Sequence, residues 1–255
     1  MQSTEIPSSP VPVRRGTIAR LTIALALLVP GAAAGAASGS AATSHPSMVS
    51  LTNDLVAHWA PVVSDFAART EPSNGSPIVE RVGTVTSDGT QNIVLILDRM
   101  TVGSKTWFDV RLSSLPNSMT GWVPNTALGT VYAVTTHLYV NRKTFTATLK
   151  RDGHVVFTTR VGVGKSYWPT PAGQFYIRDK LTNFGNPFYG PIAFGTSARS
   201  AVLTDWPGGG VVGVHGTNEP GILPGAVSHG CVRMVNSAIV RLAKLMPVGT
   251  PLTIT

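Results

Sequence analysis

Short runs of alternating apolar and polar residues dominate the chain from about residue 77. The segments IVERVGTVT, NIVLILDRM, TWFDVRL and TGWVPNTAL are rich in β-branched and aromatic residues, and SDGTQ, VGSK and SSLPNS separate them with turn-forming residues. This spacing predicts a small β barrel over residues 77–130. Trp107, Phe108 and Trp122 are expected to fill or cap its core, and stacking of one of them on a ligand is the alternative.

A second β-rich block covers residues 131–255. The segment HLYVNRKTFTATLKRDGHVVFTTR predicts two strands, a hairpin turn at Asp152-Gly153 and a third strand. NSAIVRLAKLM has helical spacing, with Asn236 or Ser237 as the expected N-cap and Pro247 as the stop, and TPLTIT predicts a closing strand. The chain is therefore expected to be mainly β, with a short C-terminal helix.

The region before these blocks, residues 38–76, has a different character. Residues 38–50 are mostly Ser, Ala, Gly and Thr, which predicts a flexible tether. The next twenty residues, LTNDLVAHWAPVVSDFAART, place Leu55, Trp59, Val62 and Phe66 at helical spacing, although Pro61 limits the length of a helix. We expect a tether followed by a short helical segment.

The N-terminal residues 1–37 have the pattern of a targeting segment. Arg14, Arg15 and Arg20 precede the apolar stretch LTIALALLVPGAAAGAA, which ends in small residues. This pattern predicts a cleaved signal peptide, and an uncleaved membrane anchor is the alternative. The mature protein is thus expected outside the cytoplasm, in the cell wall or a periplasm-like space.

The net charge of the chain limits the kinds of partner that we expect. The net charge is +8, and removal of residues 1–37 takes away three arginines and one glutamate and leaves +6. A basic exported protein suits an anionic surface such as a wall polymer, although general solubility explains the charge equally well. The chain has no arginine-rich run, so nucleic acid is not an expected partner. A monomer is expected.

The chain contains one cysteine, Cys231, which cannot form an internal disulfide. Within VGVHGTNEPGILPGAVSHGCVRMVN, His215-Gly216 lies sixteen residues before it and His229-Gly230 directly precedes it. A free thiol has a pKa of about 8.5, so a nucleophilic cysteine needs a neighbouring base or cation. We assign His215 as the base, because a histidine from a neighbouring strand can face the sulfur directly.

Other residues of this segment receive secondary roles. His229 is expected on the substrate or oxyanion side, and backbone N–H groups around Gly230 are candidate oxyanion donors. Arg233 could clamp a substrate carboxylate or tie the loop to backbone carbonyls. Zinc bound by two histidines and the thiol is an alternative from donor type, and an inert buried cysteine is another.

Two motifs together carry a family resemblance. SHGCVRM, preceded by HG, and the upstream VGVGKSYWPTPAGQFYI with its T-P-x-G-x-F element resemble the L,D-transpeptidase (YkuD-like) catalytic domain, over residues 131–255. The family often has asparagine where this chain has Arg233. WFDVRL followed by GWVP resembles bacterial SH3-like domains, so the barrel at 77–130 is expected to be SH3-like.

The family resemblance implies a substrate and a mechanism. Cys231 would attack a peptidoglycan stem peptide with loss of D-alanine, and an amine would resolve the thioester into a 3→3 cross-link. His215 would move the protons, the Gly216 carbonyl would orient its ring, and N–H groups near Gly230 and Cys231 would hold the oxyanion. Ser228 and Arg233 would shape the donor site. No metal or cofactor is implied, and carbapenems would acylate the cysteine.

Two rival functions remain open from the sequence. Water in place of the amine would make the protein an L,D-carboxypeptidase acting on the same thioester. A non-catalytic wall-binding protein would need neither Cys231 nor His215, yet the chain has both.

Overall fold

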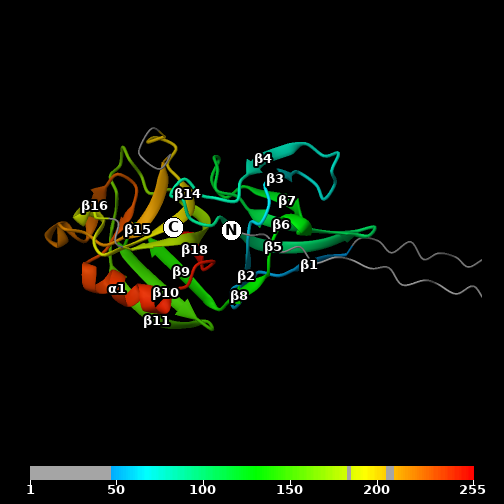
Figure 1. The fold of residues 1–255 in the computed structure, drawn as a ribbon. Coiled ribbons are helices and arrows are strands. Elements are labelled where there is room, and N and C mark those ends of the chain that lie inside the picture. Colours follow the sequence, from blue (N-terminus) through cyan, green and yellow to red (C-terminus); the bar gives the residue numbers. More distant parts are fainter. Residues whose placement is uncertain (1–46, 183–184, 205–209) are drawn as a thin grey trace, which may run out of the picture. The chain divides into compact units, whose positions relative to one another are not determined.

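The computed structural model describes residues 47–182, 185–204 and 210–255, all within one compact unit, Ser44–Thr255. The predicted signal peptide and the first part of the tether lie outside the described residues. In the described part of the chain, no helix has the length and apolar character needed to cross a bilayer. The expectation of a mainly β fold is confirmed, since the described residues form two sheets, one α-helix and a few short 3-10 turns (Figure 1).

The first sheet has eight strands in the order β4-β3-β7-β6-β5-β2-β8, with β1 paired to β5. A short 3-10 turn, η1 (Asn125–Ala127), follows β7. The sheet's assignment as SH3-like rests on the sequence resemblance alone. Its strands are β1 (Met48–Ser50), β2 (Ala57–Pro61), β3 (Phe66–Arg69), β4 (Ile78–Val82), β5 (Ile93–Val102), β6 (Lys105–Arg111), β7 (Thr120–Pro124) and β8 (Tyr132–Val134).

The predicted helical segment at 51–70 is wrong, because this stretch forms β2 and β3. Trp59 and Ala60 pair with Leu95 and Val94 of β5, and this pairing overrides the helical spacing. Leu55, which the helical pattern placed on the apolar face, is 60% exposed. The first sheet therefore begins near residue 48 and not near 77.

The second sheet has ten strands in the order β11-β10-β9-β18-β13-β14-β15-β17-β12-β16. Because β8 belongs to the first sheet, the change of sheet falls after Val134 and not after residue 130. The strands are β9 (Thr136–Asn141), β10 (Thr146–Arg151), β11 (His154–Arg160), β12 (Gly162–Gly164), β13 (Gly173–Thr182), β14 (Ile192–Arg199), β15 (Val211–His215), β16 (Gly225–Ser228), β17 (Val232–Arg233) and β18 (Pro251–Ile254).

Local turn chemistry in the second sheet follows the sequence prediction. Arg151 pairs with His154 across a two-residue turn, and Asp152 and Gly153 both have positive φ angles, 51° and 78°. This is the conformation that a tight right-twisted hairpin requires. The closing strand β18 also forms where TPLTIT predicts it, between β9 and β13.

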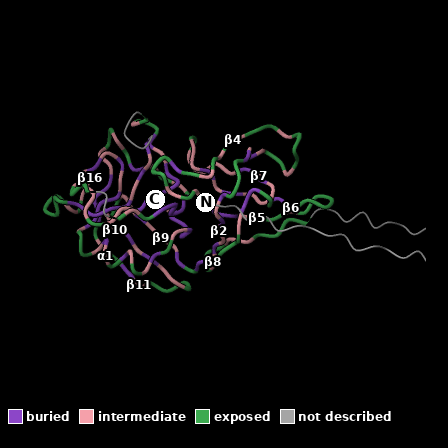
Figure 2. Tube along the Cα trace, in the orientation of Figure 1, coloured by how far each residue is buried: buried purple, intermediate pink, exposed green. Residues whose placement is uncertain are grey.

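The helix α1 (Asn236–Leu245) covers part of the second sheet's core. Ile239 and Leu242 are fully buried, and Arg151 of β10 donates to the carbonyl of Leu245 at 2.7 Å. The predicted N-cap is wrong, since Val235 holds that position without a side-chain cap. The side chain of Asn236 turns instead toward the loop after β15. Buried positions follow the strands, and exposed positions gather in the connections (Figure 2).

Candidate active site

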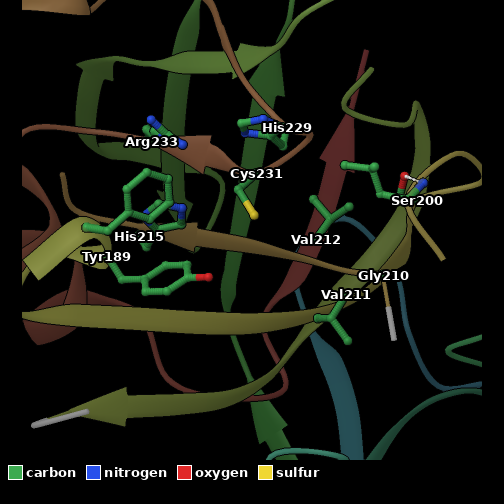
Figure 3. A pocket seen from close by; sticks show the side chains of 11 residues that line it. Tyr189, Ser200, Gly210, Val211, Val212, His215, His229, Cys231 and Arg233 are labelled. Carbon is green, nitrogen blue, oxygen red and sulfur yellow. Dashed lines mark hydrogen bonds between the residues drawn. The ribbon is translucent and has the colours of Figure 1, made fainter. Parts of the chain in front are cut away.

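Cys231 lies in the turn between β16 and β17, at the wall of an open cleft of about 410 Å³. The cleft is also lined by His215, His229 and Arg233 (Figure 3). The residue is half-buried, and its sulfur accepts a hydrogen bond from the N–H of Gly213 at 3.3 Å. Burial raises the pKa of the thiol, while the Gly213 hydrogen bond and then Arg233 lower it. At neutral pH the resting group is therefore a thiol.

Strand pairing brings His215 beside this thiol. β15 and β17 run parallel with His215 opposite Arg233, so Gly213 lies next to Cys231 on the same face of the sheet. A Cβ built on Gly213 would lie 3.8 Å from the sulfur and 3.9 Å from Cδ2 of His215. The thiol and the imidazole thus border the space that the missing side chain of Gly213 leaves open.

The imidazole of His215 has one defined tautomer. Its Nδ1 lies 2.6 Å from the carbonyl oxygen of Gly216, and a carbonyl only accepts, so Nδ1 carries the proton. Its Nε2 is buried and has no hydrogen-bond partner among the described residues. Burial lowers the pKa of His215 to about 4, with Arg233 adding to the shift and the Gly216 carbonyl opposing it. At neutral pH the ring is an uncharged base.

Asn236 fixes the backbone behind the imidazole. Its Oδ1 accepts from the N–H of Thr217 at 2.9 Å, and a Cβ on Gly216 would lie only 2.3 Å from that oxygen. Glycine at 216 is therefore required by close approach. The sequence pattern proposed Asn236 only as a helix cap, so this supporting contact was missed.

The turn that carries Cys231 is closed by side-chain hydrogen bonds. The hydroxyl of Ser228 accepts from the N–H of Gly230 at 3.0 Å and donates to the carbonyl of Cys231 at 2.6 Å. Gly230 has a φ of 119°, which favours glycine. One prediction needs correction: the Gly230 N–H, a predicted oxyanion donor, is already bonded within the turn. Ser228 is buried and does not line the cleft, so any shaping of the donor site would act through this turn, and that role stays a prediction.

Thr170 anchors the same turn from the T-P-x-G-x-F element. Its hydroxyl donates to the carbonyl of Gly230 at 2.7 Å and accepts from the N–H of Gly164 at 2.8 Å. The side chain is 1% exposed, so both bonds are shielded from water. The two sequence motifs are therefore joined physically through one hydroxyl group.

His229 lies on a different wall of the cleft from His215. Its ring packs on Trp168 with the centroids 4.1 Å apart and the planes 33° apart. Its pKa is lowered by burial first and then by Arg233 and Lys165. This position fits a residue that contacts a ligand, which is the role predicted from the sequence, and that role stays a prediction.

Arg233 is buried at the inner end of the cleft. It is 4% exposed, its guanidinium lies 4.3 Å above the ring of Phe188, and Nη1 is 3.9 Å from a carboxylate oxygen of Glu219. No hydrogen bond from Arg233 to a backbone carbonyl is present among the described residues. The predicted tie to backbone carbonyls is therefore not seen, and the predicted contact with a substrate carboxylate stays a prediction.

Phe188 and Tyr189 complete the cleft and were not placed by the sequence. They form a short 3-10 turn, η2 (Pro187–Tyr189), in which Asn186 accepts from the N–H of Phe188 at 3.0 Å. The Tyr189 ring lies 4.9 Å from the His215 ring at 70°. The Asn-Pro pair was a usable signal for this turn.

The described side chains that could bind a metal ion give little support to a metal site. Among the described residues, no three His, Cys, Asp or Glu side chains come together in a way that could hold a metal ion. The zinc alternative, in which His215, His229 and Cys231 were the ligands, does not fit this geometry.

Comparison with known proteins gives a family match over the second sheet and relatives that each cover about half of the chain. Residues 135–254 match the YkuD family model, described as the L,D-transpeptidase catalytic domain. YkuD of Bacillus subtilis, whose name assigns it to the L,D-transpeptidases, is 36% identical over 123 residues, 48% of this chain and 68% of that protein. YqjB of the same species, named in the same way, is 32% identical over 127 residues, 47% of this chain and 70% of that protein.

A solved structure also matches. The NMR structure of the catalytic domain of an Enterococcus faecium L,D-transpeptidase is 26% identical, covers 47% of this chain and 96% of that chain, and has a TM-score of 0.35. Strands β1–β8 lie outside the region that the family model matches.

Proposed function

Since this chain belongs to the L,D-transpeptidase (YkuD) family, we propose that it forms 3→3 cross-links in peptidoglycan, with Cys231 as nucleophile and His215 as base. The proposal includes export with cleavage of residues 1–37, action as a monomer, and stem peptides as substrates. No metal or cofactor takes part in the proposed reaction.

One observation carries the chemical part of this proposal. The neutral imidazole of His215 keeps an unprotonated, buried Nε2 without a described hydrogen-bond partner, at the wall that it shares with Cys231. A buried polar atom without a partner is costly to keep. It is expected where a proton has to be received during a reaction.

The first half-reaction makes a thioester. Sγ of Cys231 attacks the carbonyl carbon between the third stem residue and D-alanine, and Nε2 of His215 takes the thiol proton. The carbon–nitrogen bond then breaks, His215 passes that proton to the departing amine of D-alanine, and the acyl group stays on Cys231.

The second half-reaction transfers the acyl group. An amine of another stem peptide attacks the thioester carbonyl and gives a proton to His215. The carbon–sulfur bond breaks, and His215 returns the proton to the sulfur of Cys231. The products are an amide cross-link and the free enzyme.

The shifted pKa values suggest when the proton moves. Burial opposes both a thiolate at Cys231 and an imidazolium at His215, so an ion pair at rest is disfavoured. Proton transfer is then expected to accompany carbon–sulfur bond formation, when the charge passes to the substrate oxygen. Arg233 acts in both directions, because its charge lowers the pKa of the thiol, which favours the thiolate, and also lowers the pKa of His215, which disfavours the imidazolium.

Other cleft residues receive roles by elimination. The N–H of Gly230 is bonded to Ser228, so we assign the N–H of Cys231 as the oxyanion donor of this turn. Arg233 would bind a carboxylate of the donor stem, displacing the exposed Glu219 carboxylate that lies 3.9 Å away. Trp168 with His229 offers an aromatic wall to the bound peptide.

Product analysis tests this function against its rivals. The protein is incubated with a disaccharide tetrapeptide, with and without a competing amine, and the products are weighed by mass spectrometry. Cross-linked dimer and amine adduct support transpeptidation, whereas tripeptide alone supports L,D-carboxypeptidase action. The Cys231→Ala variant is the control. If the tetrapeptide stays unchanged with both proteins, only wall binding remains as a function.

A further inference from the structure

A second cavity of about 490 Å³ opens between the two sheets and shares no lining residue with the active-site cleft. Strands β4, β5 and β6 of the first sheet and β13 and β14 of the second contribute to its walls. Near it, the hydroxyl of Tyr176 donates to the carbonyl of Ile93 at 2.9 Å and joins β13 to β5. The cavity is thus bounded by both parts of this compact unit.

Arginine side chains dominate the charge of this cavity. Arg111 comes from the end of β6, Arg178 from β13 and Arg199 from the end of β14, and the exposed Arg81 adds a fourth positive charge. Glu80 is the one carboxylate in the lining, and it accepts a hydrogen bond from the hydroxyl of Ser114 at 2.8 Å. We call Arg111, Arg178 and Arg199 the arginine cluster.

Two members of the cluster have unused donors. Arg178 is 5% exposed, and its Nε is buried with no hydrogen-bond partner in the described residues; the Nε of Arg111 is in the same state. Neither forms an ion pair with a described carboxylate. Asp109 acts on Arg111 and Asp179 acts on Arg178 through longer-range charge interactions, but among the described residues no carboxylate lies within ion-pair distance of either guanidinium. A buried guanidinium without a direct partner is costly, so this arrangement favours an incoming anion.

The surroundings disfavour the charged form of two arginines of the cluster, although neighbouring carboxylates oppose this effect. Burial lowers the pKa of Arg111 and of Arg199, and for Arg199 the next cause is the charge of Arg178. Tyr176 supplies no compensating charge, because burial raises its pKa to about 12. Guanidinium groups stay protonated nonetheless, so Arg178 and Arg199 repel each other at neutral pH.

Hydrogen bonds within the protein fix the positions of the three arginine side chains. Arg178 donates from Nη1 to the hydroxyl of Ser113 at 2.8 Å, and Arg199 donates from Nε to the carbonyl of the same serine at 3.0 Å. Arg111 donates from Nη1 to the carbonyl of Ser118. Each guanidinium has five N–H donors, so Arg111 and Arg178, whose Nε atoms have no partner among the described residues, keep pre-oriented donors for a ligand with several oxygens.

We propose that the arginine cluster binds a phosphate group. Among the described lining residues, four arginines stand against one glutamate, and this charge suits a phosphate with several acceptor oxygens better than a single carboxylate. Exposed Arg81 and Ser87 at the cavity leave it open to solvent. The group can therefore arrive as free phosphate or as part of a phosphate-containing polymer. Since the cluster draws on both sheets, binding would also stabilise their contact.

Calorimetric titration of the full-length mature protein tests this site. The ligands are inorganic phosphate, a glycerol phosphate oligomer and succinate, each at matched ionic strength. We expect one phosphate per chain, with affinity about tenfold to hundredfold weaker in Arg178→Gln. Arg160→Gln removes one positive charge from an exposed position outside the cavity and should bind phosphate as the parent does.

The outcomes separate the sources and the failures. If the wild type binds the oligomer but not inorganic phosphate, and Arg178→Gln does not bind the oligomer, the site is supported and its phosphate comes from a polymer. No binding of either phosphate ligand, equal binding by Arg178→Gln, or equal preference for succinate overturns the proposal. Arg111→Gln should also bind phosphate more weakly. Agreement between the two variants would show that the weaker binding does not come from misfolding of one of them. Acylation of Cys231 in Arg178→Gln reports separately on the proposed transpeptidase chemistry.

Discussion

The Nδ1 of His215 lies 2.6 Å from the carbonyl oxygen of Gly216, the residue that follows it in the chain. This bond fixes the tautomer and leaves Nε2 as the proton acceptor in the cleft. A backbone carbonyl thus does what a carboxylate does in many catalytic triads, but it adds no negative charge. The ring therefore remains a weak base, and burial lowers its pKa to about 4.

The pH dependence of acylation should reflect this low pKa. We expect the rate of Cys231 acylation to stay level between about pH 5 and pH 8 and to fall below that range with a midpoint near the His215 value of about 4. Stopped-flow measurement of acylation in the wild type and in His229→Gln checks this. The variant removes the second imidazole of the cleft, so its pH profile reports on His215. A midpoint near 6.5, the value of an exposed histidine, would be inconsistent with a buried base.

Acid stability should carry the signature of the same residue. The folded pKa of His215 lies below its unfolded value, so the unfolded state binds the proton first. Stability is complete above about pH 6.5 and is lost as the pH falls toward 4, by up to about 3 kcal/mol.

Urea unfolding of wild type and His215→Gln across this pH range measures the effect. His137, whose pKa burial also lowers to about 4, contributes the same loss to both proteins, so the difference isolates His215. Parallel stability curves for the two proteins would refute the assignment.

Thr170 should matter for both stability and rate. Thr170→Val keeps the shape but removes the hydroxyl that joins Gly164 to Gly230. We expect a loss of about 1–3 kcal/mol in the free energy of unfolding, and slower acylation because the Cys231 turn loosens. Thr158→Val is the matched control on an exposed strand position, with an expected change within about 0.5 kcal/mol. Equal effects of the two substitutions would contradict the anchoring role.

Close packing behind the imidazole gives a prediction about coupling. Gly216→Ala puts a methyl group 2.3 Å from Oδ1 of Asn236, which we expect to cost about 1–3 kcal/mol. Asn236→Ala removes that oxygen, so the double variant should lose less than the sum of the two single variants. Thermal unfolding of all four proteins tests this, and strict additivity would show that the two residues do not meet.

Local signals in the sequence predicted some parts of the structure well. The Asp152-Gly153 hairpin and the C-terminal helix follow from turn chemistry and from apolar spacing, which act over a few residues. The segment around Trp59 was misread, because its pairing with β5 is set by residues more than thirty positions away. Spacing cannot supply that information when a helical pattern is also present.

The site was predictable in part for the same reason. Histidine, glycine and cysteine next to one another mark the chemistry, and strand logic puts His215 beside Cys231. The bonds of Thr170 and Asn236 join segments that are distant in sequence, so no local pattern indicates them. The Gly230 N–H was predicted to bind the oxyanion, because the sequence does not show that this N–H donates to Ser228 in the folded turn.

Intact-protein mass spectrometry during incubation with a carbapenem addresses the central claim most directly. We predict a covalent adduct that maps to Cys231 in the wild type, forms about a hundredfold to ten-thousandfold more slowly in His215→Gln, and is absent in Cys231→Ala. An adduct on another residue, or equal rates in wild type and His215→Gln, would contradict acyl transfer by this thiol and imidazole.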